Sequence, residues 1–232
     1  MSDGNPVSWP DRVRQALLAV ADAQRAPAMQ AYLRGQFPFF GIPTPLRRQA
    51  VSSLIKPRQT AAELLANARA LWAMPERECQ YVAVDLLARQ VRQLGEGDLA
   101  TLLELVRLRS WWDSVDGLAG VVGDVVRAAR RTDPDAQRSM DSALADGNLW
   151  VRRVAMLHQL GWRGETDRRR LFAYAEALAG EEDFFIRKAI GWALRDFARC
   201  EPQAVLDFLN APGRVLSSLS RREAAKHLTG LN

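Results

Sequence analysis

Apolar residues recur at steps of three and four along most of the chain, which is the spacing of one face of an α-helix. Within residues 61–72, such steps connect four apolar residues and one arginine, namely Ala62, Leu65, Ala66, Arg69 and Trp72. Strict alternation of apolar and polar residues over six or more positions, the pattern of a half-buried strand, is hard to find. The sequence therefore predicts an all-α protein.

Short polar motifs indicate where some of these helices begin. Thr60 with Glu63 and Ser220 with Glu223 have the spacing of the capping box. In that motif, each side chain accepts a hydrogen bond from the other residue's backbone N–H. We expect helices to start at both positions.

Proline and glycine give further boundaries. Proline follows Thr44 and Met74, and the first turn of a helix tolerates proline because its N–H groups have no partner there. Helix ends are expected near four glycines, Gly95, Gly147, Gly164 and Gly180.

Six segments look alike when they are aligned on their first helical turns. They begin near Leu46, Cys79, Trp112, Trp150, Phe185 and Ser220. The intervals of 33, 33, 38, 35 and 35 residues each leave room for a helix pair with its turns. We therefore expect an α–α superhelix, or solenoid, of about six helix pairs, each buried against its neighbours. The alternative is a helical bundle without repeats.

Length and composition are compatible with such a fold. The 232 residues suffice for one large domain or two small ones. With 48% hydrophobic and 25% charged residues, the chain can bury a substantial core and is not a disordered polypeptide. We expect a flexible N-terminus over residues 1–7 and a single repeat domain over residues 8–232.

Several classes of protein are excluded. No run of about 18 apolar residues could span a membrane, and no secretory signal is recognisable. The two cysteines, Cys79 and Cys200, form no C-x-x-C pair, which suits a reducing cytoplasm. Neither His158 nor His227 has a cysteine or another histidine nearby, so no metal site is expected. The phosphate-binding motif G-x-x-x-x-G-K-S/T is also absent. We expect a metal-independent protein of the cytoplasm.

The charge of the chain comes mainly from arginine. The 32 basic residues exceed the 27 acidic ones by five, and only three of the basic residues are lysines, Lys56, Lys188 and Lys226. Four of the six aligned segments carry adjacent basic residues just after the helix start. These pairs are Arg47 and Arg48, Arg152 and Arg153, Arg187 and Lys188, and Arg221 and Arg222.

Helices that line one wall of a curved stack would collect these side chains into a basic stripe on its concave face. Arginine binds phosphate through two parallel hydrogen bonds, so nucleic acid fits such a stripe. The 27 acidic residues could equally pair with these arginines on an ordinary salt-bridged surface. From charge alone, both interpretations are open.

The most unusual segment is SWWDSVD at residues 110–116. Trp112 and Asp116 are four residues apart, so they share one face of the predicted helix. An aromatic ring beside a carboxylate suits a ligand that is apolar and positively charged. In an ordinary helix, Trp112 would instead pack in the core and Asp116 would pair with an arginine.

Further aromatic and basic residues lie in equivalent segments. Trp192 has Lys188 one turn before it and Arg195 three residues after it. The neighbouring Gly191 indicates that another group approaches the backbone closely. Tyr32 precedes a proline-flanked turn. Each feature is weak by itself.

Together these segments resemble the bacterial DNA alkylation repair glycosylases of the AlkD type, which are built from HEAT-like helical repeats. The resemblance runs from about residue 8 to residue 230. It is carried by YLRGQFPFFGIPTPLRRQ at 32–49, LWAMPEREC at 71–79, SWWDSVD at 110–116, NLWVRR at 148–153, FFIRKAIGWALRDFA at 184–198 and SRREAAKH at 220–227.

The resemblance implies roles for five residues. In that family the aspartate that closes the WWDSVD motif is catalytic, which corresponds to Asp116, and the second tryptophan, Trp112, lines the cleft beside it. The tryptophan of the AIGW motif, Trp192, is its counterpart across the cleft. Arg153 would contact DNA near the lesion, and Tyr32 would also approach the DNA. Further expected DNA-binding residues are Arg47, Arg48, Arg152, Arg187, Lys188 and Arg195.

The implied activity is that of a monofunctional DNA glycosylase in base excision repair. It would hydrolyse the N-glycosidic bond of positively charged alkylated purines, N3-alkyladenine and N7-alkylguanine. A fixed carboxylate stabilises the positive charge that develops on the sugar. The implied partner is double-stranded DNA containing alkylated bases, bound by a monomer without a cofactor. Base flipping into a pocket is left open. The alternative is a non-catalytic repeat scaffold that binds DNA or an acidic protein on its concave face.

Overall fold

The computed structural model describes residues 7–213 and 215–228. Within these ranges the chain forms thirteen α-helices and four short 3₁₀ helices and no strand, which confirms the all-α prediction. Two compact units divide the chain, unit 1 (Met1–Leu94) and unit 2 (Gly95–Asn232). Of the segment 1–7, expected to be flexible, only Val7 lies within the described residues. The single domain over residues 8–232 stays a prediction.

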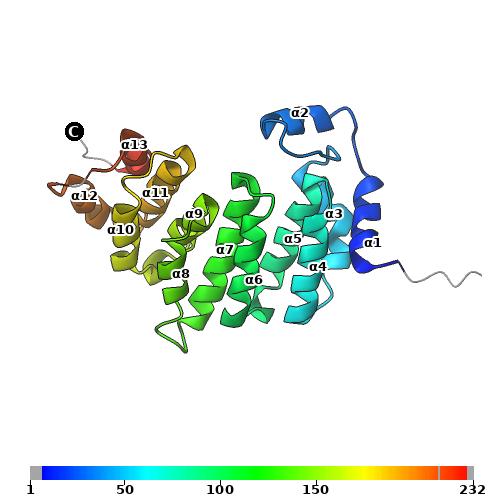
Figure 1. Cartoon of the computed structure of the whole chain (residues 1–232), viewed down its shortest axis with the longest axis horizontal. Helices are drawn as coiled ribbons and strands as arrows, with labels where there is room; N and C mark the ends of the chain where they lie inside the picture. The colour runs from blue at the N-terminus through cyan, green and yellow to red at the C-terminus, as the bar shows by residue number, and fades with distance from the viewer. Residues whose placement is uncertain (1–6, 214, 229–232) are drawn as a thin grey trace, which may run out of the picture. The chain divides into compact units, whose positions relative to one another are not determined.

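Unit 1 contains five α-helices and one 3₁₀ helix (Figure 1). They are α1 (Trp9–Leu18), α2 (Ala26–Tyr32), α3 (Thr44–Ile55), α4 (Ala61–Ala73), α5 (Arg77–Arg89) and η1 (Val91–Gln93). α1 packs against α3, and α4 packs against α5, so these four helices form two pairs. Val13, Val51, Leu71 and Leu86 are fully buried in this unit.

Unit 2 contains eight α-helices and three 3₁₀ helices (Figure 1). They are η2 (Glu96–Asp98), α6 (Leu99–Arg107), α7 (Trp112–Ala129), α8 (Arg138–Ala143), α9 (Leu149–Leu157), η3 (Arg163–Glu165), α10 (Arg168–Ala177), α11 (Phe184–Phe197), α12 (Pro202–Asn210), α13 (Ser218–Ala224) and η4 (Ala225–His227).

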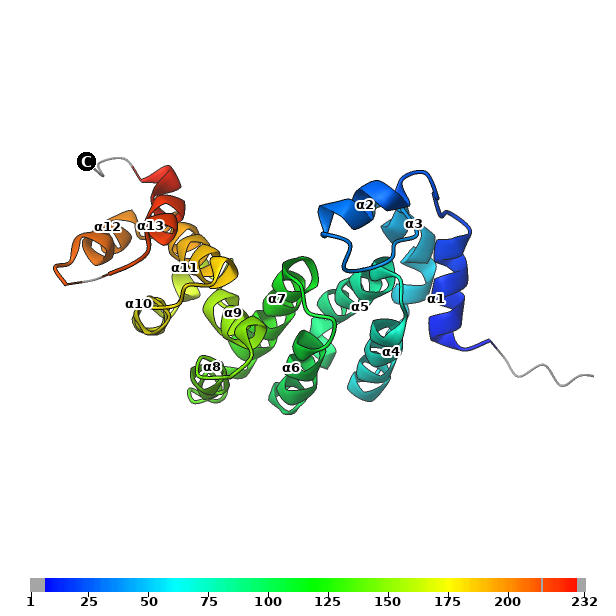
Figure 2. The ribbon, with the colours of Figure 1, turned by 45° about the horizontal axis from the view of Figure 1, so that its top comes forward.

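The helices of unit 2 form two layers. α7, α9, α11 and α13 contact one another in chain order and make up the first layer, as Figure 2 shows. α6, α8, α10 and α12 each pack against this layer. The buried residues of α11 include Ile186, Ala189, Ile190, Ala193 and Leu194, whose spacing of three and four turns one face toward the neighbouring helices.

The repeat predicted from the sequence is confirmed. Each of the six aligned segments begins within the first three residues of a helix, and these helices are α3, α5, α7, α9, α11 and α13. A second helix packs against each of the first five, namely α1, α4, α6, α8 and α10. The chain is therefore built from helix pairs.

Two of the four predicted helix starts are correct. The Thr60 hydroxyl accepts a hydrogen bond from the N–H of Glu63, and the Glu63 carboxylate accepts one from the N–H of Thr60 at 2.8 Å. This capping box begins α4. Pro45 lies in the first turn of α3, as expected.

The other two predicted starts are wrong because tertiary contacts prevail over the local pattern. α13 is capped by Ser217, while the Ser220 hydroxyl donates to the carbonyl oxygen of Arg187 at 2.9 Å. Glu223 pairs with cations instead of closing a capping box. Pro75 lies ahead of α5, because the N–H of Arg77 is bound to the Pro38 carbonyl oxygen and the helix begins only there.

A buried carboxylate holds the turn before α3. Glu78 of α5 is fully buried and accepts hydrogen bonds from the N–H groups of Phe40, Gly41 and Ile42 at 3.0, 2.9 and 3.0 Å. Gly41 has a φ of 87°, and a side chain there would collide with the backbone of Asp22. These hydrogen bonds therefore join two of the segments that carry the family resemblance, 32–49 and 71–79.

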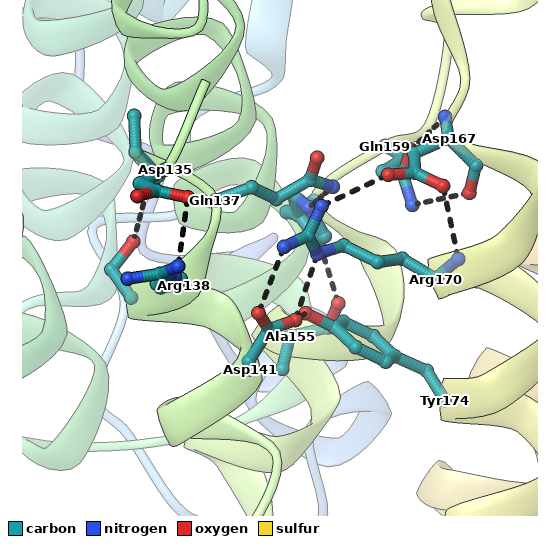
Figure 3. A network of polar contacts seen from close by, with 12 residues as sticks. Asp135, Gln137, Arg138, Asp141, Ala155, Gln159, Asp167, Arg170 and Tyr174 are labelled. Atoms are coloured by element: carbon teal, nitrogen blue, oxygen red, sulfur yellow. Dashed lines mark hydrogen bonds and ion pairs between the residues drawn. The ribbon is translucent and has the colours of Figure 1, made fainter. Parts of the chain in front are cut away.

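A network of hydrogen bonds and ion pairs connects α8 to α10 (Figure 3). Arg170 donates to both oxygens of Asp141 at 2.9 and 3.0 Å and to Asp167 at 3.0 Å. The Tyr174 hydroxyl also donates to Asp141. The hydrogen bonds from Arg170 hold the pKa of the Asp141 carboxyl below its ordinary value. This network stabilises the packing between the two helices.

Candidate functional site

Asp116 lies on the second turn of α7, beside Arg153 of α9. Its Oδ1 accepts a hydrogen bond from Arg153 Nε at 2.7 Å, and its Oδ2 accepts one from Nη2 at 2.9 Å. The Arg153 side chain is 1% exposed, whereas that of Asp116 is 24% exposed. A buried arginine therefore orients a carboxylate that solvent can reach.

α11 supplies the remaining contacts of Arg153. Arg153 Nη1 donates to the carbonyl oxygen of Phe185, and the guanidinium carbon lies 5.3 Å from the ring centre of Trp192. α7, α9 and α11 thus each contribute one side chain at this point. The structure brings together three of the sequence-predicted site residues, Asp116, Arg153 and Trp192.

The Asp116 carboxylate is partly desolvated. Burial raises its pKa above the ordinary value, and the hydrogen bonds and charge of Arg153 act in the opposite direction. The nearby charge of Asp113 adds a further rise. A carboxylate with little water around it attracts a nearby positive charge more strongly than a hydrated one does. The site is therefore suited to stabilise developing positive charge.

A second cation lies beside Trp192. Lys188 Nζ is 5.7 Å from the ring centre of Trp192 and 6.0 Å from that of Phe184. Trp192 therefore has two cations, Arg153 and Lys188, within the distance at which a ring attracts positive charge. The same ammonium donates a hydrogen bond to Glu223 at 2.9 Å.

Glu223 of α13 is the buried centre of a cation cluster. Besides Lys188, it accepts hydrogen bonds from Arg195 at 3.1 Å and Lys226 at 2.9 Å. Burial opposes ionisation, but the hydrogen bonds from Lys188 and Lys226 outweigh it and lower the pKa of Glu223 to about 2. Three positive charges and one negative charge leave the cluster with a net charge of +2.

Gly191 lets α13 approach α11. A Cβ atom at this position would overlap the Cβ of Glu223 and lie 2.9 Å from the carbonyl oxygen of Ser220. The close approach expected beside Trp192 is therefore that of a neighbouring helix. It brings Glu223 within reach of Lys188.

The two adjacent tryptophans have different surroundings. Trp111 precedes α7, and its ring lies 5.7 Å from that of Trp150 and 5.1 Å from that of Phe185. Trp112 is the first residue of α7, one turn before Asp116, and is half-buried. Trp111 thus belongs to an aromatic cluster, while Trp112 shares the helical face of Asp116, as predicted.

The predicted DNA-binding cations of unit 1 are already paired. Arg47 and Arg48 both contact Asp85, at 3.0 and 2.9 Å, and the Arg48 side chain is 62% exposed. Tyr32, at the end of α2, is 74% exposed. These three residues belong to unit 1, whereas Asp116 belongs to unit 2.

Arg152 and Arg187 in unit 2 share a partner. Arg152 forms two hydrogen bonds with the carboxylate of Glu181 at 2.6 and 2.8 Å. Arg187 Nε donates to the backbone carbonyl oxygen of the same residue at 2.9 Å. A partly exposed ion pair contributes little to stability, so such an arginine can exchange its carboxylate for a phosphate.

Sequence reasoning missed the acidic partners of these cations. Arg47 and Asp85 are 38 residues apart, and Lys188 and Glu223 are 35 residues apart. The 35-residue separation equals the interval between the aligned segments that begin at Phe185 and Ser220, whereas the 33-residue interval from Leu46 to Cys79 leads from Arg47 to Gln80. A search for acids one repeat after each basic residue would therefore have found Lys188 with Glu223 but not Arg47 with Asp85.

Two further observations concern metal binding and membrane-spanning helices. No group of three His, Cys, Asp or Glu side chains that could hold a metal ion occurs among the residues that the structure describes. No helix within the same ranges has the length and apolar character needed to cross a membrane.

The sequence model of the family described as DNA alkylation repair enzyme matches residues 13–228. The chain belongs to the DNA alkylation repair enzyme family. The match spans both units and confirms the resemblance to AlkD-type proteins. No curated protein sequence matches the chain.

Solved structures agree with this family assignment. A predicted DNA alkylation repair enzyme from Enterococcus faecalis is 30% identical, with 91% of this chain and 98% of that chain covered and a TM-score of 0.82. AlkD2 from Streptococcus mutans is 16% identical, with 95% and 99% covered and a TM-score of 0.63. The protein smu.31 from Streptococcus mutans UA159 is 16% identical, with 96% and 100% covered and a TM-score of 0.62. The last two show the shared fold alone.

Proposed function

We propose that the protein is a monofunctional DNA glycosylase that removes positively charged alkylated purines, N3-alkyladenine and N7-alkylguanine, from duplex DNA. The observation that carries this proposal is the pairing of a buried Arg153 with a partly exposed Asp116. This pair provides a carboxylate that is held in one orientation and is only partly hydrated. The membership in the DNA alkylation repair enzyme family supports the class of substrate.

The reaction uses the positive charge of the damaged base. When the bond between C1′ and the base nitrogen breaks, both electrons go to the base, which leaves as a neutral molecule. Positive charge then develops on the sugar, and the Asp116 carboxylate stabilises it electrostatically. Water adds to C1′ and releases a proton to solvent, or to Asp116 as the intermediate acceptor.

The surrounding residues have supporting roles in this proposal. The family resemblance predicts that Arg153 contacts DNA, but its side chain is 1% exposed, so we assign it instead as a positioning residue that fixes the plane of the Asp116 carboxylate. Trp112 and Trp192 would pack against the deoxyribose and favour its positive charge through their ring faces. Lys188 is hydrogen-bonded to Glu223, and an ammonium paired with a carboxylate is not a nucleophile. This pairing favours water over an amine as the attacking group.

The test is base release by Asp116→Asn on methylated duplex DNA. We expect a rate about 10²–10³-fold below wild type, the loss seen when one stabilising polar group is removed from an active site. Asp124→Asn is the matched control, because Asp124 is exposed on the same helix, α7. Free purines are identified by mass spectrometry. Release by Asp116→Asn at the wild-type rate would remove Asp116 from this role.

Base release and binding to duplex DNA, measured together, separate this function from two others. A protein that only detects lesions would bind methylated duplex without releasing a base. Contacts to phosphates make the binding of duplex DNA depend on salt concentration. A repeat scaffold for an acidic protein would show no such salt-dependent binding to duplex DNA. We place the glycosylase in the cytoplasm, on the nucleoid, as a monomer.

A further inference from the structure

A groove in unit 1 is lined by four cations and no acid. The residues after α3 contribute Lys56 and Arg58, and the end of α5 with η1 contributes Arg89 and Arg92. The groove measures about 540 Å³. All four side chains belong to exposed residues. Two walls, each with two positive charges, therefore face one open space.

These cations lack the carboxylate partners that the predicted DNA-binding residues have. Arg47, Arg48 and Arg152 each form an ion pair with an acid of the same unit. Among the described residues, no ion pair involves Lys56, Arg58, Arg89 or Arg92; Arg58 donates only to the amide oxygen of Gln93, at 3.0 Å. Among the described residues, no carboxylate therefore neutralises the positive charge of the groove.

The nearby helix ends neutralise only part of this positive charge. α3 and α5 both end at the groove, and a helix C-terminus carries a partial charge of about −0.5. Two such ends offset about one of the four positive charges. A net charge of about +3 remains directed at solvent.

A buried side chain fixes the two walls relative to each other. Gln90 of the α5 end donates to the carbonyl oxygens of Ile55 and Pro57 at 3.0 and 2.9 Å, and its own oxygen accepts the N–H of Gln59 at 2.9 Å. Gln90 is 8% exposed. The loop that carries Lys56 and Arg58 is thus bound to the helix that carries Arg89, so the backbone on the two sides of the groove needs little ordering when an anion binds.

We propose that this groove binds the phosphate backbone of duplex DNA, as a contact site additional to the Asp116 site. The ligand is a row of phosphates, because four cations with a net charge of about +3 along one open groove exceed the charge of about −1.5 to −2 that a single phosphate group carries. The choice of DNA rests on the proposed function. The groove adds affinity for duplex of any sequence and takes no part in bond cleavage.

The first test is the salt dependence of binding to undamaged duplex DNA. Removing the four charges (K56Q/R58Q/R89Q/R92Q) should make the negative slope of log K against log salt shallower by about 0.9 for each phosphate that the groove no longer neutralises. Base release at saturating enzyme should stay at the wild-type rate. The control variant R168Q/R169Q removes two exposed arginines of α10. An unchanged slope in the groove variant, or an equal decrease per charge in the control, would overturn the proposal.

The second test uses the unaltered protein. Lys56 is one of only three lysines, so acetylation followed by mass spectrometry reports on the groove directly. We expect duplex DNA to protect Lys56 from acetylation, and polyglutamate at equal charge to protect it less. Protection by polyglutamate alone would overturn the proposal in favour of an acidic protein. If the protein releases bases while DNA leaves Lys56 unprotected, the groove proposal is overturned and the proposed glycosylase function stands. If the protein binds no DNA at all, both proposals are overturned.

Discussion

Arg153 is buried, and Asp116, which it holds through two parallel hydrogen bonds, is partly exposed. The guanidinium cannot lose its proton, and its planar fork fits both carboxylate oxygens at once. Its third contact, a hydrogen bond to the Phe185 carbonyl oxygen, also holds the guanidinium in its buried position. Arg153 thus sets the direction of the carboxylate without occupying the surface that a substrate would meet.

Arg153→Lys should therefore impair base release more than folding. A lysine keeps the positive charge but offers a single point of contact, so the Asp116 carboxylate can rotate. Misplacement of a reacting group by about 1 Å costs about 10²-fold in rate, and we expect a loss of that order in single-turnover release from methylated duplex. Binding to undamaged duplex should change little.

Arg170→Lys is the matched control for this substitution. Arg170 also holds a carboxylate, that of Asp141, through two hydrogen bonds of 2.9 and 3.0 Å. It lies in the network of Figure 3 between α8 and α10, and should affect the free energy of unfolding without affecting base release. Equal losses of base release in both variants would mean that general destabilisation, and not the direction of Asp116, limits the rate.

Gly191→Ala should weaken the packing of α13. The added methyl group would overlap the Cβ of Glu223, which sits on a helix backbone and cannot rotate away. Overpacking of this kind costs about 1–3 kcal/mol of unfolding free energy. Gly120→Ala on α7 is the control, since no atom lies within 4 Å of a Cβ there, and alanine should stabilise that helix by up to about 1 kcal/mol. Urea denaturation measures both, and equal values for the two variants would contradict the close contact.

Features that local patterns determine could be predicted from the sequence, whereas features that tertiary contacts determine could not. The apolar periodicity predicts the helices, because each helix must bury one face whatever its neighbours are, and the six similar segments predict the repeat. The position of Asp116 and Trp112 on one face followed from their spacing alone. The spacing of Ser220 and Glu223 predicts a capping box, and only the packing of α13 on α11 shows that Glu223 pairs with Lys188. Charge partners one repeat apart are invisible to rules that consider a single helix.

His158 at the end of α9 is a buried neutral histidine. Its Nδ1–H donates to the carbonyl oxygen of Ala155 at 2.6 Å, and its Nε2 accepts a hydrogen bond from Gln137 at 2.8 Å. Burial, together with the positive charges of Arg130 and Arg170, lowers its pKa from 6.5 to about 4. Protonation would leave a charge in the core and remove the acceptor that Gln137 needs.

The stability of the protein should therefore fall on mild acidification. Between pH 6.5 and about pH 4, the unfolded chain binds a proton at His158 and the folded chain does not, so acid favours unfolding. The linkage predicts a loss of about 2 kcal/mol between pH 7.5 and pH 5. His158→Gln should lack this loss in urea denaturation at the two pH values. Glu223 does not interfere, because its depressed pKa affects stability only as the pH falls from 4.5 toward about 2. A wild-type protein that is equally stable at both pH values, or a variant with the same loss, would show that His158 is not the group responsible.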